Sequence, residues 1–213
     1  MTETICITNV RDEALARSNS CFNVHDHLKD KSVEELRAIS DSDRMPWHTL
    51  CLNVTGDLNV GTMVRTSHCL GAKSVIVFGR QRIDNRSLVG AANYIKYEKI
   101  LGIDDKLVLN ADLFIKVMTE RNLTPIFVEM GGTSLSEFDW CETVYSIINN
   151  GKEPCLIMGN EGDGIPEDIL NTKSLFYKSM VVSIPMRGVI RSMNVAVAHS
   201  IVSSDLCLNL GWM

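Results

Sequence analysis

Residues 155–166 read Cys155-Leu156-Ile157-Met158-Gly159-Asn160-Glu161-Gly162-Asp163-Gly164-Ile165-Pro166. The first four residues are apolar and predict a buried strand that ends at Gly159. The glycines at 159, 162 and 164 allow close backbone approach and positive φ angles, and Pro166 suits the first turn of a helix. The spacing GxxGxG matches neither the dinucleotide motif nor the P-loop. Because Glu161 would repel phosphate, the turn favours a ligand with cationic or hydroxyl groups, although a plain turn also explains it.

The same alternation of apolar runs and helical patterns extends to both sides of this stretch. Strands are expected at 49–54, 74–78, 125–128, 155–158 and 181–184, and helices at 57–70, 111–121 and 192–206. Either Asp57 or Asn59 can cap the first of these helices. Continuous β-branched runs between helices predict an α/β fold, with a parallel sheet covered on both faces. Ligands bind beyond the carboxyl ends of such strands, which is where the glycine-rich turns lie.

A second segment, residues 59–66, reads Asn59-Val60-Gly61-Thr62-Met63-Val64-Arg65-Thr66. Asn59 and Arg65 lie nearly two helical turns apart, so both can face one end of the sheet. Arginine is unusual in an otherwise apolar helix. A surface position is the simple explanation, and a functional position is the alternative.

A third segment covers residues 183–198, Ser183-Ile184-Pro185-Met186-Arg187-Gly188-Val189-Ile190-Arg191-Ser192-Met193-Asn194-Val195-Ala196-Val197-Ala198. It joins a strand end to a proline-containing loop and then to a helix rich in alanine and valine. Taken alone, it predicts that Ser192 or Asn194 is the N-cap of that helix.

Together, in this order, the three segments resemble the three motifs of the SpoU (TrmH-type) RNA 2'-O-ribose methyltransferases of the SPOUT class. Those motifs are N-x-G-x-x-x-R-T, G-N-E-G-x-G and I-P-M-x-G-x-x-x-S-x-N-V. The resemblance runs from about Trp47 to Leu208, and 87–91 is similar to the family's S-x-G-A stretch. One position departs from the family: Met193 replaces the usual leucine, a tolerated apolar exchange.

The resemblance implies a deep C-terminal trefoil knot, an exception among proteins, and S-adenosylmethionine as methyl donor. It also implies a homodimer that pairs through the C-terminal helix, whose apolar residues Val195, Ala198, Ile201, Val202 and Leu206 are expected to form much of the contact. It implies that Arg65 acts at the ribose hydroxyl of the acceptor. Four further residues would build and orient the catalytic site: Asn59, Glu161, Ser192 and Asn194. The donor would be held at Met130, Gly131, Gly159, Ile184, Met186, Ser192 and Met193.

A ribose hydroxyl is a poor nucleophile near neutral pH, so the enzyme must align it with the methyl group and remove or delocalise its proton. Arginine is a weak base because its pKa lies above about 12. Arg65 would therefore need a strongly depressed pKa, or would instead clamp the neighbouring phosphate. The sequence leaves both roles open.

The composition is that of a cytoplasmic globular protein. Of 213 residues, 45% are hydrophobic, enough for one substantial core. No apolar run reaches the ~18 residues of a membrane span, and the polar start is unlike a signal peptide. The seven cysteines include no CxxC pair and are expected to be reduced. Cys21, His25 and His27 have no fourth ligand at a familiar spacing, so no metal site is predicted.

Residues 1–46 are predicted to form a charged, partly helical extension to a methyltransferase domain at 47–213. The extension holds 6 Lys and Arg against 9 Asp and Glu. Ser32 and Glu35 fit a capping box that opens a helix through about Ile39. Its acidity weakens a role as an RNA-binding arm and favours packing or covering a dimer.

The net charge of −5 argues mildly against nucleic acid. Local basic residues can still contact an RNA backbone, and the candidates are Arg80, Arg82, Arg86, Arg187 and Arg191. The expected acceptor is RNA, more readily tRNA than rRNA because no separate RNA-binding domain is recognised. The main alternative is a non-catalytic RNA-binding member of the knotted fold. A dinucleotide-binding domain is the other alternative, and the missing GxGxxG counts against it.

Overall fold

The computed structural model describes residues 7–9, 23–79, 85–103 and 108–213. Within these ranges the chain forms a seven-stranded sheet in the order β1-β4-β3-β2-β6-β5-β7. The short β1 pairs antiparallel with β4, and the remaining pairs are parallel. The strands are β1 (Ile7–Asn9), β2 (Met45–Leu52), β3 (Ala72–Phe78), β4 (Lys96–Ile100), β5 (Leu123–Ser134), β6 (Glu153–Met158) and β7 (Met180–Ser183).

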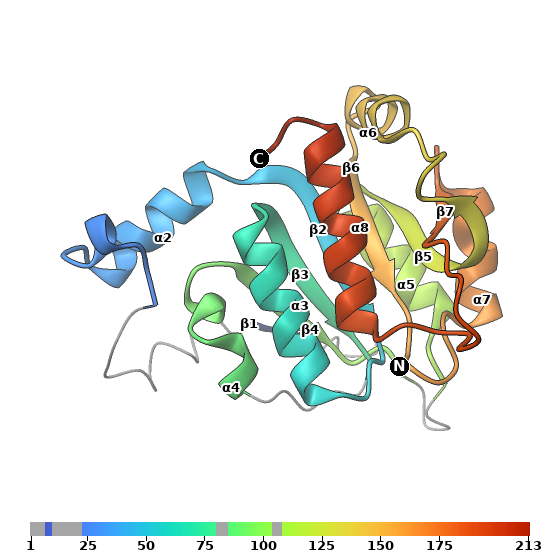
Figure 1. Cartoon of the computed structure of the whole chain (residues 1–213), viewed down its shortest axis with the longest axis horizontal. Helices are drawn as coiled ribbons and strands as arrows, with labels where there is room; N and C mark the ends of the chain where they lie inside the picture. Colours follow the sequence, from blue (N-terminus) through green and yellow to red (C-terminus); the bar gives the residue numbers. More distant parts are fainter. Residues whose placement is uncertain (1–6, 10–22, 80–84, 104–107) are drawn as a thin grey trace.

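Helices cover both faces of the sheet, as predicted (Figure 1). On one face α3 (Asp57–Cys69) packs against α8 (Val195–Asn209), which also contacts α6 (Trp140–Asn149). On the other face lie α5 (Ala111–Glu120) and the short α7 (Glu167–Leu170). The helix α2 (Val33–Ser42) projects beside the sheet, and the short α4 (Asn85–Leu88) packs on α3. None of the helices in the described ranges has the length and apolar character needed to cross a membrane.

Successive residues of the central strands enter different cores. On β2, Cys51 joins the core under α3 and α8, whereas Leu50 and Leu52 join the core under α5. On β6, Leu156 and Met158 join the core under α3 and α8, and Cys155 and Ile157 join the core under α5. Because side chains alternate between faces and both faces are covered, such strands are apolar throughout. This is why the runs at 49–54 and 155–158 identified a parallel sheet.

Several boundaries differ from the predicted ones. The capping box is confirmed: Glu35 N–H donates to Ser32 Oγ, and Ser32 N–H donates to the Glu35 carboxylate. The N-cap of α3 is Gly56 instead of Asp57 or Asn59, because the Asn59 side chain is bound elsewhere. The last helix begins at Val195 and not at Ser192, with Asn194 as its N-cap.

The elements that were not predicted include β1, β4, α4 and α6. The sequence of β4, Lys-Tyr-Glu-Lys-Ile, mixes charged and apolar residues and so lacks the continuous apolar pattern of the other strands. The strand accommodates Glu98 because this residue forms ion pairs with Lys96 and Arg121. The strand β5 also continues past the predicted 125–128 through the glycines at 131 and 132. A Cβ added to Gly132 would lie 2.5 Å from the carbonyl oxygen of Val181 on β7, so only glycine permits this close pairing.

The parallel topology assembles the site at one edge of the sheet. The carboxyl ends of β2, β6 and β7 lead into residues 53–56, the loop 159–164 and the segment from Ile184 onward. Residues 129–132, where the pairing of β5 is irregular, lie at the same edge. The N-terminus of α3 and the N-terminus of α8 meet at this edge as well. Residues from all three sequence motifs are therefore brought to one place.

Candidate functional site

The loop 159–164 is a tight, internally bonded turn. Asn160 N–H donates to the Gly164 carbonyl (2.9 Å), and Gly164 N–H donates back to the Asn160 carbonyl (3.0 Å). The Asn160 side chain donates to the Asn53 carbonyl (2.7 Å) and accepts from Gly162 N–H (2.8 Å). A Cβ on Gly159 would lie 2.6 Å from the Gly164 carbonyl carbon. Glycine at 159 is thus a steric requirement of the turn.

Glu161 ties this loop to the start of α3. Its carboxylate accepts from Thr55 N–H (2.8 Å), Thr55 Oγ1 (2.9 Å), Gly56 N–H (3.0 Å) and Asn59 Nδ2 (2.7 Å). Partial burial works against its charge, but the donors from Asn59, Thr55 and Gly56 outweigh it. They hold the pKa of the Glu161 carboxyl at about 2, below its usual 4.5. Glu161 is therefore an ionised anchor rather than a proton acceptor.

Asn59 connects the same network to the third motif. Its Oδ1 accepts a hydrogen bond from Asn194 Nδ2 at 3.1 Å. The Oδ1 of Asn194 in turn accepts from the N–H groups of Ala196 and Val197 and so caps α8. The residues Asn59, Glu161 and Asn194, predicted to share one site, form a continuous chain of hydrogen bonds.

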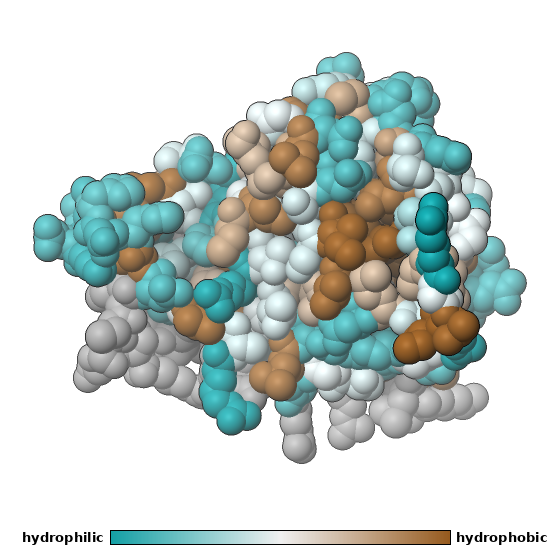
Figure 2. Space-filling view, in the orientation of Figure 1, coloured by the Kyte–Doolittle hydropathy of each residue, from teal (hydrophilic) through white to brown (hydrophobic). Residues whose placement is uncertain are grey.

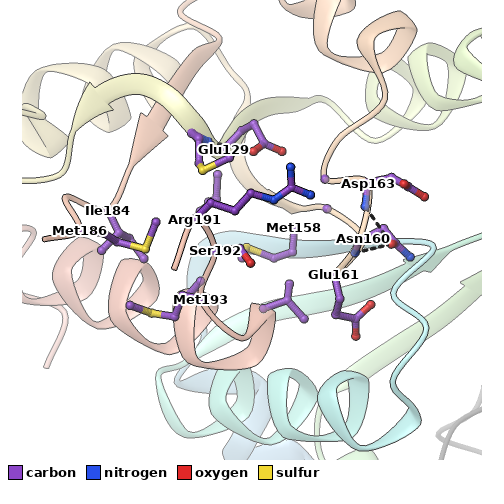
Figure 3. Close-up of a pocket in the computed structure, with 17 residues that line it drawn as sticks. Glu129, Met158, Asn160, Glu161, Asp163, Ile184, Met186, Arg191, Ser192 and Met193 are labelled. Atoms are coloured by element: carbon purple, nitrogen blue, oxygen red, sulfur yellow. Dashed lines mark hydrogen bonds between the residues drawn. The ribbon is translucent and has the colours of Figure 1, made fainter. Parts of the chain in front are cut away.

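A cavity of about 230 Å³ opens beside this network (Figure 3). The predicted donor-binding residues that line it are Met130, Gly159, Ile184, Met186, Ser192 and Met193, together with Glu161 from the catalytic set. Gly131 is absent from the lining, and so are Asn59 and Asn194, which act through Glu161 and the helix cap. The floor is apolar, formed by Val128, Met158, Val195 and Ala198.

Charged residues surround the cavity with an excess of carboxylates. Glu129, Glu161 and Asp163 line it with Arg191 as the basic residue. Arg191 was predicted as an RNA contact, and the structure places it in the lining of this cavity. Glu129, Asn160 and Asp163 were not singled out from the sequence. The available signal was the place of Glu129 directly after the predicted strand 125–128.

Arg65 lies elsewhere. It is exposed on α3 and has no hydrogen bond or ion pair within the described ranges. It lines a second cavity of about 820 Å³, with Tyr94 and Trp212 also in its wall. The cavity beside Glu161 does not include Arg65. Within a single chain Arg65 is therefore not part of the cavity beside Glu161, and its role at the ribose hydroxyl stays a prediction.

Of the four other arginines predicted to contact RNA, two lie within the described residues. Arg86 and Arg187 are exposed, which suits contact with a large polyanion. Arg80 and Arg82 fall outside the described residues, as does Cys21. His25 and His27 are exposed, and their rings stack with centroids 5.8 Å apart.

The three motifs joined through Glu161 and Asn59 coincide with a family match. The sequence model of the SpoU rRNA Methylase family matches residues 47–204. The chain belongs to this family. It is 26% identical over 186 residues to a 23S rRNA (guanosine-2'-O-)-methyltransferase RlmB of Neisseria meningitidis serogroup B, covering 85% of this chain and 63% of that protein.

Solved structures share the fold of this SpoU-family chain. The TrmH/SpoU tRNA modifying enzyme of A. aeolicus has a TM-score of 0.62 at 20% identity, over 84% of each chain. An AdoMet-bound rRNA methyltransferase from Sinorhizobium meliloti has a TM-score of 0.61 at 21% identity, over 82% of this chain and 60% of that one. The chain thus spans less than two thirds of the length of the Neisseria and Sinorhizobium proteins.

Proposed function

We propose that this chain transfers a methyl group from S-adenosylmethionine to a ribose 2'-hydroxyl of RNA. The observation that carries the proposal is the hydrogen-bonded chain Glu161–Asn59–Asn194 beside the 230 Å³ cavity. It joins the family's three motifs around one pocket. The named relatives, an rRNA (guanosine-2'-O-)-methyltransferase and AdoMet-bound family members, support the same reaction.

The residues of the cavity suit this donor. Gly159, Gly162 and Gly164 present backbone without side chains to the cavity, and Ile184, Met186 and Met193 supply apolar contacts. Glu129 and Asp163 add negative charge that suits a sulfonium and an ammonium group. When bound, the donor supplies an electrophilic methyl group on a good leaving group. The residues of the chain hold that group in place and shield it from water.

Glu161 contributes positioning and not proton transfer. Because its carboxylate is ionised and fully engaged by Thr55, Gly56 and Asn59, it fixes the loop 159–164 against α3. Ser192 is exposed at the cavity and offers a hydroxyl toward the acceptor. The Ser192 Oγ can accept a hydrogen bond from the ribose 2'-hydroxyl while the 2'-oxygen aligns with the methyl group.

We further propose that the active form is a homodimer in which Arg65 of one subunit serves the cavity of the other. Arg65 is exposed, has no partner within the described part of its own chain, and lines a different cavity. The apolar side chains Val197, Ile201 and Leu208 lie exposed on α8, and Figure 2 shows apolar residues gathered on that face. A second subunit would cover them.

The chain path at the cavity is proposed to be the trefoil knot of the family. The segment 184–194 runs from β7 at the sheet edge back to α8 over the centre of the sheet, and both this segment and the loop 159–164 line the cavity. A knot would clamp these two segments together without a disulfide. Experimental tracing of the backbone from residue 153 to 209 tests it.

For the acceptor we propose tRNA before rRNA. The tRNA modifying enzyme of A. aeolicus matches this chain over 84% of both lengths, which supports this choice. Incubation with methyl-labelled donor and either total tRNA or rRNA, followed by alkaline digestion, tests both acceptor and position. Methylation at O2' removes the nucleophile that cleaves the next phosphodiester, so label is expected in alkali-resistant dinucleotides.

Two results would contradict the proposal. Label in mononucleotides would place the methyl group on a base. Donor binding without transfer to any RNA would instead favour the non-catalytic alternative. A nucleoside digest of RNA from cells lacking the protein then identifies which ribose loses its methyl group.

A further inference from the structure

One carboxylate in the cavity is placed differently from the others. Glu129 is the residue that follows Val128 on β5, and Val128 is in register with Met158 on β6. Glu129 therefore lies on β5 just past the last residue paired with β6, and Gly159 lies just past the end of β6. The glycine-rich turn begins where β6 ends, and the acidic residue lies within β5 where its pairing with β6 stops.

Hydrogen bonds from the backbone hold the Glu129 carboxylate against this turn. Its Oε2 accepts from Ile165 N–H at 2.8 Å, and its Oε1 accepts from Met130 N–H at 2.9 Å. A Cβ added to Gly164 would lie 2.5 Å from Oε2, so the side chain rests directly on the loop. Glu129 is half-buried and lines the cavity. It has no basic partner within the described ranges.

The acceptor capacity of Glu129 is only half used. An ionised carboxylate has about four lone-pair sites, and the two backbone donors occupy one on each oxygen. One site on each oxygen is left, so a ligand with two adjacent donors can bind both oxygens at once. Glu161 has no such capacity, because four donors surround it. Asp163 is exposed at the rim of the cavity, where a hydrated group suits it better.

We propose that Glu129 binds the vicinal 2',3'-diol of the donor's ribose and so selects donors that carry both hydroxyls. This rests on the proposed use of S-adenosylmethionine. The arrangement parallels dinucleotide-binding sheets, where an acidic residue accepts from a ribose hydroxyl beside a glycine-rich turn. The arrangement here is built from GxxGxG and from a glutamate on the neighbouring strand.

Calorimetric binding of two probes tests this without relying on catalysis: S-adenosylhomocysteine and its 2',3'-dideoxy analogue. The wild-type protein is expected to bind the dideoxy analogue about 10- to 100-fold more weakly, since hydrogen bonds to charged groups are strong. In Glu129→Gln the preference should fall to about threefold or less, with affinity for the analogue unchanged. Glu137→Gln, at an exposed glutamate that does not line the cavity, is the matched control and should keep the wild-type preference. Thermal unfolding of the free variants checks that the loop is intact.

Four results would overturn the inference. The first is equal weakening of both probes in Glu129→Gln, which would make Glu129 a support for the loop alone. The second is an unchanged preference in that variant. The third is a wild-type protein that binds both probes equally well, a result that stands even if the variant does not fold. The fourth comes from a third probe, S-adenosylhomocysteine without its amino group. If Glu129→Gln loses discrimination against this probe alone, Glu129 contacts the ammonium group and not the diol. If the wild-type protein binds neither probe, the proposed function fails along with the inference.

Discussion

At the scale of single residues, Glu161 and Arg65 have opposite surroundings. Glu161 receives four hydrogen bonds from residues 55–59. Arg65, on the same α3, has no such bond within the described ranges. The first residue organises the site within one chain, and the second is free to act on something outside it.

Glu161→Gln should destabilise the protein by about 1–2 kcal/mol at neutral pH, because a charged acceptor is lost while its donors remain. The pKa of Glu161 is lowered in the folded state, so its contribution is present above pH 4.5 and is lost as the pH falls toward about 2. Urea unfolding of both proteins at pH 7, 5 and 3 should therefore show a difference that shrinks with acidification. A difference that stays constant with pH would contradict the assigned role.

Arg65→Ala should lower methyl transfer more than tenfold while leaving donor affinity nearly unchanged, because the arginine lies away from the donor cavity. Single-turnover transfer and calorimetry with S-adenosylhomocysteine measure the two quantities. Arg65→Lys, which keeps the charge but loses the planar fork, should recover little activity if the guanidinium geometry matters. Activity above a tenth of wild type in the alanine variant would show that Arg65 is not part of the reaction.

At the scale of elements, α8 carries more apolar surface than its own chain covers. Val195, Val202 and Leu206 were expected to contribute to a dimer contact, but they are buried in the core of the same chain. Of the residues predicted for that contact, Ile201 is the one with a large exposed apolar side chain, and Val197 and Leu208 join it. The unburied side of α8 is thus a different set from the one the pattern indicated.

The double substitution Val197→Asp and Ile201→Asp should convert a micromolar dimer to a monomer, because it places charge in an apolar contact. Sedimentation velocity at several concentrations measures the change. Lys116→Asp on α5, at the opposite face of the sheet, is the control and should stay dimeric. A wild-type protein that sediments as a monomer at micromolar concentration would contradict the proposed dimer.

At the scale of the whole molecule, an acidic chain is proposed to bind a polyanion. RNA affinity should fall steeply with salt, because each phosphate contact releases counterions. Reversing Arg80, Arg82 and Arg86 to Glu should weaken binding by about tenfold or more, and reversing Lys29 and Lys31 should have little effect. Filter binding to tRNA between low and physiological salt compares the slopes. Equal losses from both sets would make residues 1–46 an RNA-binding arm.

Much of the fold could be predicted from local patterns. The apolar runs that became β2, β3, β6 and β7 identified a parallel sheet, because strands buried on both faces must be apolar at every position. Capping signals identified Ser32 and narrowed the cap of the last helix to Ser192 or Asn194, since helix ends need side-chain partners for their free N–H groups. The ordered motifs also identified Asn59, Glu161 and Asn194 as partners. By contrast, β4 depends on the ion pair of Glu98 with Arg121, and the extension of β5 depends on the close contact of Gly132 with β7. Each contact joins residues that are far apart along the chain, so a local pattern does not reveal it.

The sequence by itself determined the residue types of the site and the edge of the sheet to which they belong, because strand ends and turns follow from short-range pattern. Only the tertiary structure decided which residues touch. Glu129 reaches the glycine loop because β5 and β6 pair side by side in the sheet, although α6 separates them along the chain. Arg65 lies at a different cavity, nearly two turns of α3 from Asn59. Periodicity specifies the face of a helix, but distance to a cavity depends on how the elements pack.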